Sequence, residues 1–231
     1  MARIALDDVS VTAIGDDELT ILHPTTLQLT EQRIALIGSN GSGKSTLARL
    51  LNGLVRPAAG TVRVDDLDSV RNGADLRKRV GFVFTDPDSQ IVMPTPAEDI
   101  GLSLRRSKLS RSERLARAVE VLASYGLDHL ADVSVHSLSG GQKQLLAIAG
   151  VLATSPDVLV ADEPTTLLDL RNTGLVADLL FGLAQQLVLV THDLDLAARC
   201  DRILVVEQGA VVFDGEPIDA IAYYRDSVAA T

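Results

Sequence analysis

The chain has 231 residues, of which 46% are apolar, and its 31 acidic and 21 basic side chains give a formal net charge of −10. The apolar fraction excludes a disordered chain, and the acidic balance argues against a nucleic-acid-binding protein, which needs clustered cations. A single cysteine, Cys200, excludes an internal disulfide and favours a reducing compartment. No apolar stretch is long enough to cross a bilayer and the first residues lack a signal-peptide core, so we expect a soluble protein that is not exported; if it works at a membrane, something else holds it there.

The first part of the chain predicts short strands around one helix. Strands are expected over residues 4–6, 10–14, 25–30 and 34–37, and further strands over 60–64 and 80–84. Between them, residues 45–54 have helical spacing, because Leu47, Leu50, Leu51 and Leu54 share one face.

The rest of the chain predicts a helical stretch and then alternating helices and strands. Three prolines forbid a continuous helix over 86–96, and residues 97–130 look helical, with an amphipathic segment at 111–124. Beyond them we expect helices at 145–152, 172–186 and 194–199, strands at 158–161, 187–190 and 203–206, and frayed residues 227–231. This alternation predicts an α/β fold with a mostly parallel sheet covered on both faces.

The first chemical motif fits the phosphate-binding pattern G-x-x-x-x-G-K-[ST] and lies between an expected strand and an expected helix, as that pattern requires. Glycines let several backbone N–H groups point at phosphate oxygens, and the helix adds its positive end. We expect Lys44 to reach the β- and γ-phosphates of ATP and the Ser45 hydroxyl to bind Mg²⁺. A glycine-rich turn that matches by chance is the alternative. The predicted nucleotide-binding residues here are Gly38, Ser39, Asn40, Gly41, Ser42, Gly43, Lys44, Ser45 and Thr46.

A pair of acids, Asp162 and Glu163, ends the apolar run at 158–161. Open α/β sheets bind ligands at this end of their strands, and neighbouring strand residues point to opposite faces. Asp162 is therefore expected to serve the metal, directly or through water, while Glu163 faces the γ-phosphate and polarises the attacking water. An acidic strand exit on the surface is the alternative interpretation.

A second possible anion cradle is formed by Ser139, Gly140, Gly141 and Gln142, just before an expected helix. Lying between the glycine-rich loop and the acid pair, this segment closely resembles the signature of ATP-binding cassette (ABC) ATPases. The resemblance extends from about residue 4 to residue 215. It implies a P-loop NTPase fold: a RecA-like core over residues 1–85 and 151–231, an N-terminal antiparallel β part, and a helical subdomain inserted at about 86–150.

The resemblance also implies how two such domains work together. Residues 139–142 of one domain are expected to contact the γ-phosphate held by Lys44 of another, so that monomers are nearly inactive. His192 matches the family's switch histidine, which holds the γ-phosphate and water in line; a capping or core histidine is the alternative. Asp169 matches the loop that crosses the interface between the domains.

The segments 80–90 and 94–100 resemble the energy-coupling-factor branch of the family, which serves uptake of vitamins and of cobalt or nickel. Pro87, Asp88 and Gln90 resemble the short helix that faces a membrane partner in that branch, although their spacing is one residue tighter; an ordinary exposed loop is the alternative.

The sequence departs from most ABC ATPases at three places. Thr85 stands where a glutamine helps to hold Mg²⁺ in most ABC ATPases, and its hydroxyl is shorter than a glutamine side chain by about two bonds. The predicted metal set is Ser45, Asp162 and Thr85, with Gln90 as the residue that compensates if Thr85 is too short. No aromatic residue precedes Phe82, which leaves Ala13 and Ile14 for apolar contact with adenine. Leu145 replaces an arginine.

With these departures, the segments 84–87, 144–147 and 163–169 most resemble ATP-binding subunits of biotin uptake. We therefore expect an ATPase at the cytoplasmic face of the cell membrane, using ATP and Mg²⁺. Its expected partners are a second copy or a paralogous ATPase, a transmembrane coupling protein that contacts residues 85–90, and a substrate-binding membrane protein. Cobalt, nickel or another vitamin is the alternative cargo; a soluble non-transport ABC ATPase and a plain P-loop kinase are the alternative classes.

Overall fold

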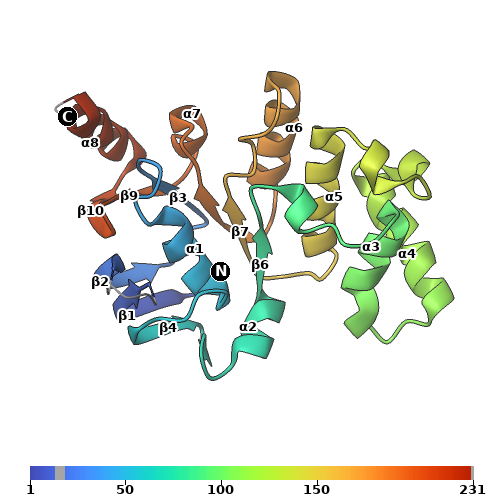
Figure 1. Cartoon of the computed structure of the whole chain (residues 1–231), viewed down its shortest axis with the longest axis horizontal. Coiled ribbons are helices and arrows are strands. Elements are labelled where there is room, and N and C mark those ends of the chain that lie inside the picture. The colour runs from blue at the N-terminus through green and yellow to red at the C-terminus, as the bar shows by residue number, and fades with distance from the viewer. Residues whose placement is uncertain (14–18, 230–231) are drawn as a thin grey trace.

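The computed structural model of the protein describes residues 1–13 and 19–229. A six-stranded sheet with helices on both faces lies between a four-stranded antiparallel sheet and a group of helices (Figure 1). This architecture confirms the predicted α/β fold class with an N-terminal antiparallel part. In the described part of the chain, no helix is both long and apolar enough to span a bilayer.

The six-stranded sheet carries the chain segments with the chemical motifs. Its order is β10 (Ala210–Gly215), β9 (Arg202–Glu207), β3 (Arg33–Ile37), β8 (Gln186–Val190), β7 (Val158–Asp162) and β6 (Val80–Val83), and only β10 is antiparallel to its neighbour. All residues of β3, β6, β7 and β8 are buried, as expected for parallel strands covered on both faces. The segments that follow β3, β7 and β8 therefore leave the sheet at one edge.

The four-stranded sheet corrects two of the predicted strands. Its order is β2 (Thr20–Leu29), β1 (Ile4–Thr12), β4 (Ala59–Val64) and β5 (Leu67–Asp68). The expected strands at 4–6 and 10–14 are one strand, because a bulge around Asp8, whose φ is 49°, lets the strand continue past its acidic pair. Gly60 lies against this bulge, where a Cβ would come within 2.3 Å of the Asp8 carbonyl oxygen. Ile14, the predicted end of the second strand, lies outside the described residues.

The helices differ from the prediction mainly at their ends. The helical stretch expected at 97–130 consists of separate helices, since Thr95 and Ser110 each cap one with a side-chain oxygen. The helix expected at 172–186 ends at Phe181, and the expected fraying at 227–229 is wrong, because the C-terminal helix α8 continues to Ala229. The α-helices are α1 (Lys44–Asn52), α2 (Gly73–Arg79), α3 (Pro96–Ser103), α4 (Arg111–Ser124), α5 (Gly140–Leu152), α6 (Leu170–Phe181), α7 (Leu194–Ala197) and α8 (Pro217–Ala229); the 3₁₀ helices are η1 (Pro87–Ser89), η2 (Leu104–Arg106), η3 (Asp128–Leu130) and η4 (Val135–Ser137).

Three apolar clusters hold these elements together. The first packs α1 between the two sheets, and the second covers the other face of the six-stranded sheet with α5, α6, α7 and α8. The third lies among α3, α4 and α5 (Figure 1). Helix α5 belongs to two clusters, since Ile148 packs in the second while Leu146 and Ala149 pack in the third. The division into a core and a helical subdomain at about 86–150 stays a prediction, and α5 is the element that joins the two parts.

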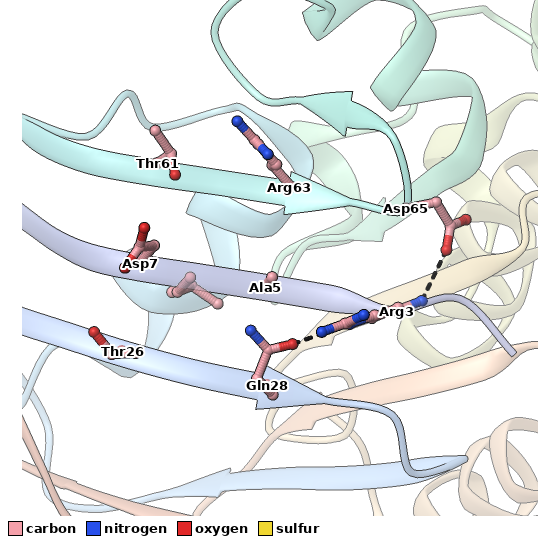
Figure 2. A pocket seen from close by; sticks show the side chains of 9 residues that line it. Arg3, Ala5, Asp7, Thr26, Gln28, Thr61, Arg63 and Asp65 are labelled. Carbon is pink, nitrogen blue, oxygen red and sulfur yellow. Dashed lines mark hydrogen bonds between the residues drawn. The ribbon is translucent and has the colours of Figure 1, made fainter.

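The outer face of the four-stranded sheet is polar. Figure 2 shows Arg3, Arg63 and Gln28 standing around the small side chain of Ala5, in a shallow pocket of about 470 Å³. Arg3 Nε donates a hydrogen bond to Gln28 Oε1 over 3.1 Å, and the Arg3 backbone N–H donates to Asp65. Basic and acidic side chains are mixed on this face, so it has no excess of one charge (Figure 2).

Candidate functional site

The glycine-rich loop joins β3 to α1 at the edge where the parallel strands end. Gly38 and Gly43 have φ values of 147° and 104°, in the left-handed region, and a Cβ on Gly38 would lie 2.0 Å from the Val206 carbonyl oxygen. Helix α1 begins at Lys44 with no side-chain cap and no acidic residue in its first turn. Its first backbone N–H groups are therefore free to bind an anion.

Lys44 is buried and folds back over this loop. Its Nζ donates hydrogen bonds to the carbonyl oxygens of Gly38, at 2.8 Å, and Ser39, at 2.7 Å. Burial lowers the pKa of Lys44, while the carboxylates of Glu163 and Asp162 act in the opposite direction. The ammonium group thus lies inside the loop, at the position predicted from the motif.

Ser45 and Asp162 meet across the sheet edge. Ser45 Oγ donates a hydrogen bond of 2.8 Å to Asp162 Oδ1, and Arg49 Nη2 lies 3.3 Å from Asp162 Oδ2. The described residues contain no group of three or more histidine, cysteine or acidic side chains that could hold a metal. A hydroxyl and a carboxylate suit Mg²⁺, which takes its remaining ligands from water and phosphate oxygens. Ser42 Oγ, buried in the same loop, has no partner among the described residues and offers another polar atom to a ligand.

Glu163 turns away from Asp162 and contacts a histidine. Its φ of 52° is left-handed, and its backbone N–H donates to the Val190 carbonyl at the end of β8. Glu163 Oε2 lies 2.8 Å from His192 Nδ1 and accepts a 2.8 Å hydrogen bond from Thr166 Oγ. The structure therefore brings Glu163 and His192 together. Thr166, which lies three residues after Glu163 on the same turn, was not predicted from the sequence as a site residue.

Thr85 and Gln90 make structural contacts near Asp162. Thr85 Oγ donates a 2.8 Å hydrogen bond to the Asp162 backbone carbonyl. Gln90 accepts from the Phe84 backbone N–H and donates to the Ala147 carbonyl on α5. Both side chains thus hold the segment after β6 to its neighbours, and a metal contact by Thr85 stays a prediction.

Ser139 and the residues after it form the start of α5. The Ser139 hydroxyl accepts from the Gln142 backbone N–H, and Gln142 Oε1 accepts from the Ser139 N–H, which makes a reciprocal cap. Gly141 packs against α6, because a Cβ there would come within 2.4 Å of the Asn172 side chain. Asp169 caps α6 by accepting from the Asn172 N–H. Within the described residues, no hydrogen bond joins 139–142 to the glycine-rich loop.

Beside the loop lie backbone groups, the apolar side chain of Val206 and, next to Gly209, the imidazole ring of His23. The Gly209 N–H donates to the Ser42 carbonyl, and Gly43 and Gly209 both lie close to the Ile21 carbonyl. Of the two residues predicted to contact adenine, Ala13 directly follows the end of β1, and Ile14 is outside the described residues.

Comparisons with known proteins agree with this geometry. A family model described as ABC transporter matches residues 22–166. A protein of Deinococcus radiodurans, named as an ABC transporter ATP-binding protein without a substrate, is 51% identical, over 91% of this chain and 93% of that protein. The biotin transport ATP-binding protein BioM of Rhizobium etli is 44% identical, over 90% and 92% of the two chains. The energy-coupling factor transporter ATP-binding protein EcfA1 of Halalkalibacterium halodurans is 40% identical, over 80% and 68%.

Solved structures show the same fold. The dimeric, post-hydrolysis structure of the ATP-binding cassette MJ0796 with ADP and Pi has a TM-score of 0.82 and 31% identity, and the match covers 93% of this chain and 98% of that one. The structure of cbiO1 from Clostridium perfringens, part of the ABC transporter complex cbiONQ, has a TM-score of 0.81 and 32% identity, with 95% and 90% covered.

The contact between Gly141 and Asn172 predicts a paired stability effect. We expect Gly141→Ala to lower the free energy of unfolding by about 1–3 kcal/mol, because the new methyl group overlaps the Asn172 amide. Asn172→Ala in the same chain should recover most of this loss. Urea unfolding followed by circular dichroism measures both.

The matched control is Gly101→Ala in α3, where a Cβ meets nothing within 4 Å. Alanine is the better helix former, so this change should be neutral or stabilising. Equal effects of the two alanines, or no rescue by Asn172→Ala, would contradict the predicted overlap.

Proposed function

Because this chain belongs to the ATP-binding proteins of ABC transporters and hydrolyses ATP, we propose that it is the ATPase of an energy-coupling-factor uptake complex for biotin. The observation that carries the proposal is the convergence of Lys44, Ser45, Asp162, Glu163 and His192 at one sheet edge. The 44% identity to BioM supports biotin over other cargoes. The 40% identity to an energy-coupling factor transporter ATP-binding protein whose name gives no cargo keeps cobalt, nickel or another vitamin as the alternative.

We assign the chemistry to the following side chains. Residues 38–46 hold the phosphates, with the Lys44 ammonium on the β- and γ-phosphates. Ser45 and Asp162 would hold Mg²⁺, which would offset the phosphate charge when bound, and Thr85 stands in the place of a third ligand. Glu163 accepts a proton from the attacking water, while His192 orients Glu163 and contacts the γ-phosphate.

The second half of the site comes from another subunit. Residues 139–142 form a helix start at which the backbone N–H groups of Gly140 and Gly141 make no hydrogen bond among the described residues, and none of the four residues is hydrogen-bonded to the glycine-rich loop there. A second copy, or a paralogous ATPase, would bring its own Ser139 cradle to the γ-phosphate, with Asp169 at the interface. The dimeric state of MJ0796 with ADP and Pi supports this arrangement.

The membrane partner docks beside residues 85–90. A groove of about 280 Å³ runs there between the six-stranded sheet and the α3–α5 group, with Phe82, Phe84 and Gly150 in its wall. The Phe82 and Phe84 rings lie 4.8 Å apart. This partly apolar groove suits a short helix of a transmembrane coupling protein, which links the ATPase to a substrate-binding membrane protein. The chain itself is then peripheral, at the cytoplasmic face of the membrane.

Replacing Glu163 tests its role as the base. Glu163→Gln should keep ATP binding and lower the hydrolysis rate at least about a hundredfold, because the amide cannot accept the proton. The unhydrolysed ATP should also stabilise the closed dimer. Phosphate release and sedimentation velocity with ATP or ADP measure these effects.

Thr166→Val is the matched control, since it removes a hydrogen bond to Glu163 but leaves the carboxylate. It should retain much more activity than Glu163→Gln. Wild-type turnover by Glu163→Gln, or equal turnover by monomers and dimers, would contradict the assignment.

The Thr85 position predicts an altered requirement for Mg²⁺. Thr85→Gln should lower the Mg²⁺ concentration for half-maximal hydrolysis by roughly tenfold, because the longer side chain adds a metal-directed oxygen. Thr85→Val, which removes only the hydrogen bond to the Asp162 carbonyl, serves as the control. If the Mg²⁺ dependence of hydrolysis is unchanged in Thr85→Gln, the prediction that residue 85 lies at a Mg²⁺-ligand position is contradicted.

Co-purification from native membranes tests the transport proposal. We expect the tagged chain to retain an integral membrane coupling protein, a substrate-binding membrane protein and bound biotin, identified by mass spectrometry. Retained cobalt or nickel would establish the alternative cargo. A chain that retains no membrane protein would contradict transport and favour a soluble ABC ATPase.

A further inference from the structure

Basic side chains gather in one part of this acidic protein. Residues 105–117 contain six of the 21 lysines and arginines but only one acid, Glu113. They belong to η2, to α4 and to the turn between them, in the group of helices that contains α3 and α4 (Figure 1). The rest of the chain is correspondingly more acidic, so the charge of this segment is opposite in sign to the net charge of the protein.

Part of this basic region lines a cleft of about 780 Å³ between α2 and η2. The residues that line this cleft combine cationic side chains with hydroxyl groups. None of the lining residues in the described chain has an acidic side chain. The polar lining residues are Arg77, Lys78, Arg106, Ser103, Ser107 and Thr154. Guanidinium, ammonium and hydroxyl donors on one wall are the groups that bind phosphate.

The charges on this wall are only partly neutralised. Lys78 Nζ lies 2.6 Å from Asp75 Oδ1, and Asp75 also feels the charge of Arg106. The guanidinium groups of Arg77 and Arg106 make no hydrogen bond or ion pair with other residues that the structure describes. Three cations therefore face one carboxylate, which leaves positive charge for a ligand.

The cleft continues the groove assigned to the membrane partner. Arg77, Ser103 and Thr154 line both spaces. The groove starts at Phe84 and Gln90 near the catalytic edge, and the cleft lies beyond the opposite ends of β6 and α5. A transmembrane partner in the groove would thus bring the membrane surface toward the cleft.

From this continuity, which rests on the proposed function, we propose that the cleft between α2 and η2 binds the phosphate of an anionic phospholipid headgroup. A headgroup beside the partner would meet Arg77, Lys78 and Arg106 and the nearby hydroxyls. Such binding adds a second attachment to the membrane besides the protein partner. An anionic leaflet favours it, because juxtamembrane cations are attracted to its surface.

Vesicle flotation of the full chain tests the proposal. We expect the chain to bind phosphatidylcholine vesicles that contain phosphatidylglycerol, to bind pure phosphatidylcholine vesicles much less, and to be released by salt. Lys78→Gln with Arg106→Gln should weaken binding to the anionic vesicles roughly 25-fold, at about fivefold for each cation. Both residues line only the cleft, so ATP hydrolysis should not change.

The control removes the same charge elsewhere. Arg3→Gln with Arg63→Gln acts on the outer face of the four-stranded sheet and should leave vesicle binding within about twofold of wild type (Figure 2). Equal loss by the two double variants, or no preference of the wild type for anionic vesicles, would overturn the proposal.

Two further results identify other occupants and would also overturn it. If inorganic phosphate stabilises the wild type but not the cleft variant in thermal unfolding, while vesicles are not bound, the site takes free phosphate. If the cleft variant floats normally but loses the membrane protein in co-purification, an acidic segment of that partner occupies the cleft. Loss of the membrane partner by the wild type would instead contradict the proposed function.

Discussion

The hydrogen bond between Ser45 and Asp162 joins two parts of the chain that are 117 residues apart in sequence. It forms because β3 and β7 lie in one parallel sheet, separated only by β8, so that the loops following all three strands leave from the same edge. Lys44, Glu163 and His192 reach the same edge by this route. The buried pairing of β3, β8 and β7 is thus the constraint that brings these five residues together, and changes in it would separate groups that local structure alone cannot bring together.

Local sequence was sufficient where one motif fixes one backbone geometry. The glycine-rich loop, its position between a strand and a helix, and the acid pair after an apolar strand could all be predicted from residues 34–54 and 158–163. The strand at 4–12 could not, because the acidic pair at Asp7 and Asp8 looks like a turn, and only a pairing partner shows that it is a bulge. The helix at 217–229 was missed altogether.

The side-chain partners of Glu163 show a different limit of sequence reasoning. Strand alternation predicts that Asp162 and Glu163 point apart, but the left-handed φ of Glu163 and the position of Thr166 depend on a tight turn after β7. Thr85 was predicted as a metal ligand, and its hydroxyl also makes a hydrogen bond to the main chain of β7 that its sequence position does not reveal. These hydrogen bonds depend on the distances between elements of the fold. The composition of the chain and the spacing of its residues do not give those distances.

The hydrogen bonds of Thr85 and Gln90 have a mechanical consequence. Thr85 ties the segment after β6 to the carbonyl of Asp162, and Gln90 ties the same segment to Ala147 in the helix that starts after Ser139. These two hydrogen bonds connect the segment after β6 to both β7 and α5. A force applied to residues 85–90 would therefore be transmitted both to β7, which ends at Asp162, and to α5, which starts after Ser139. Movement of the segment would in this way be coupled to both groups of residues.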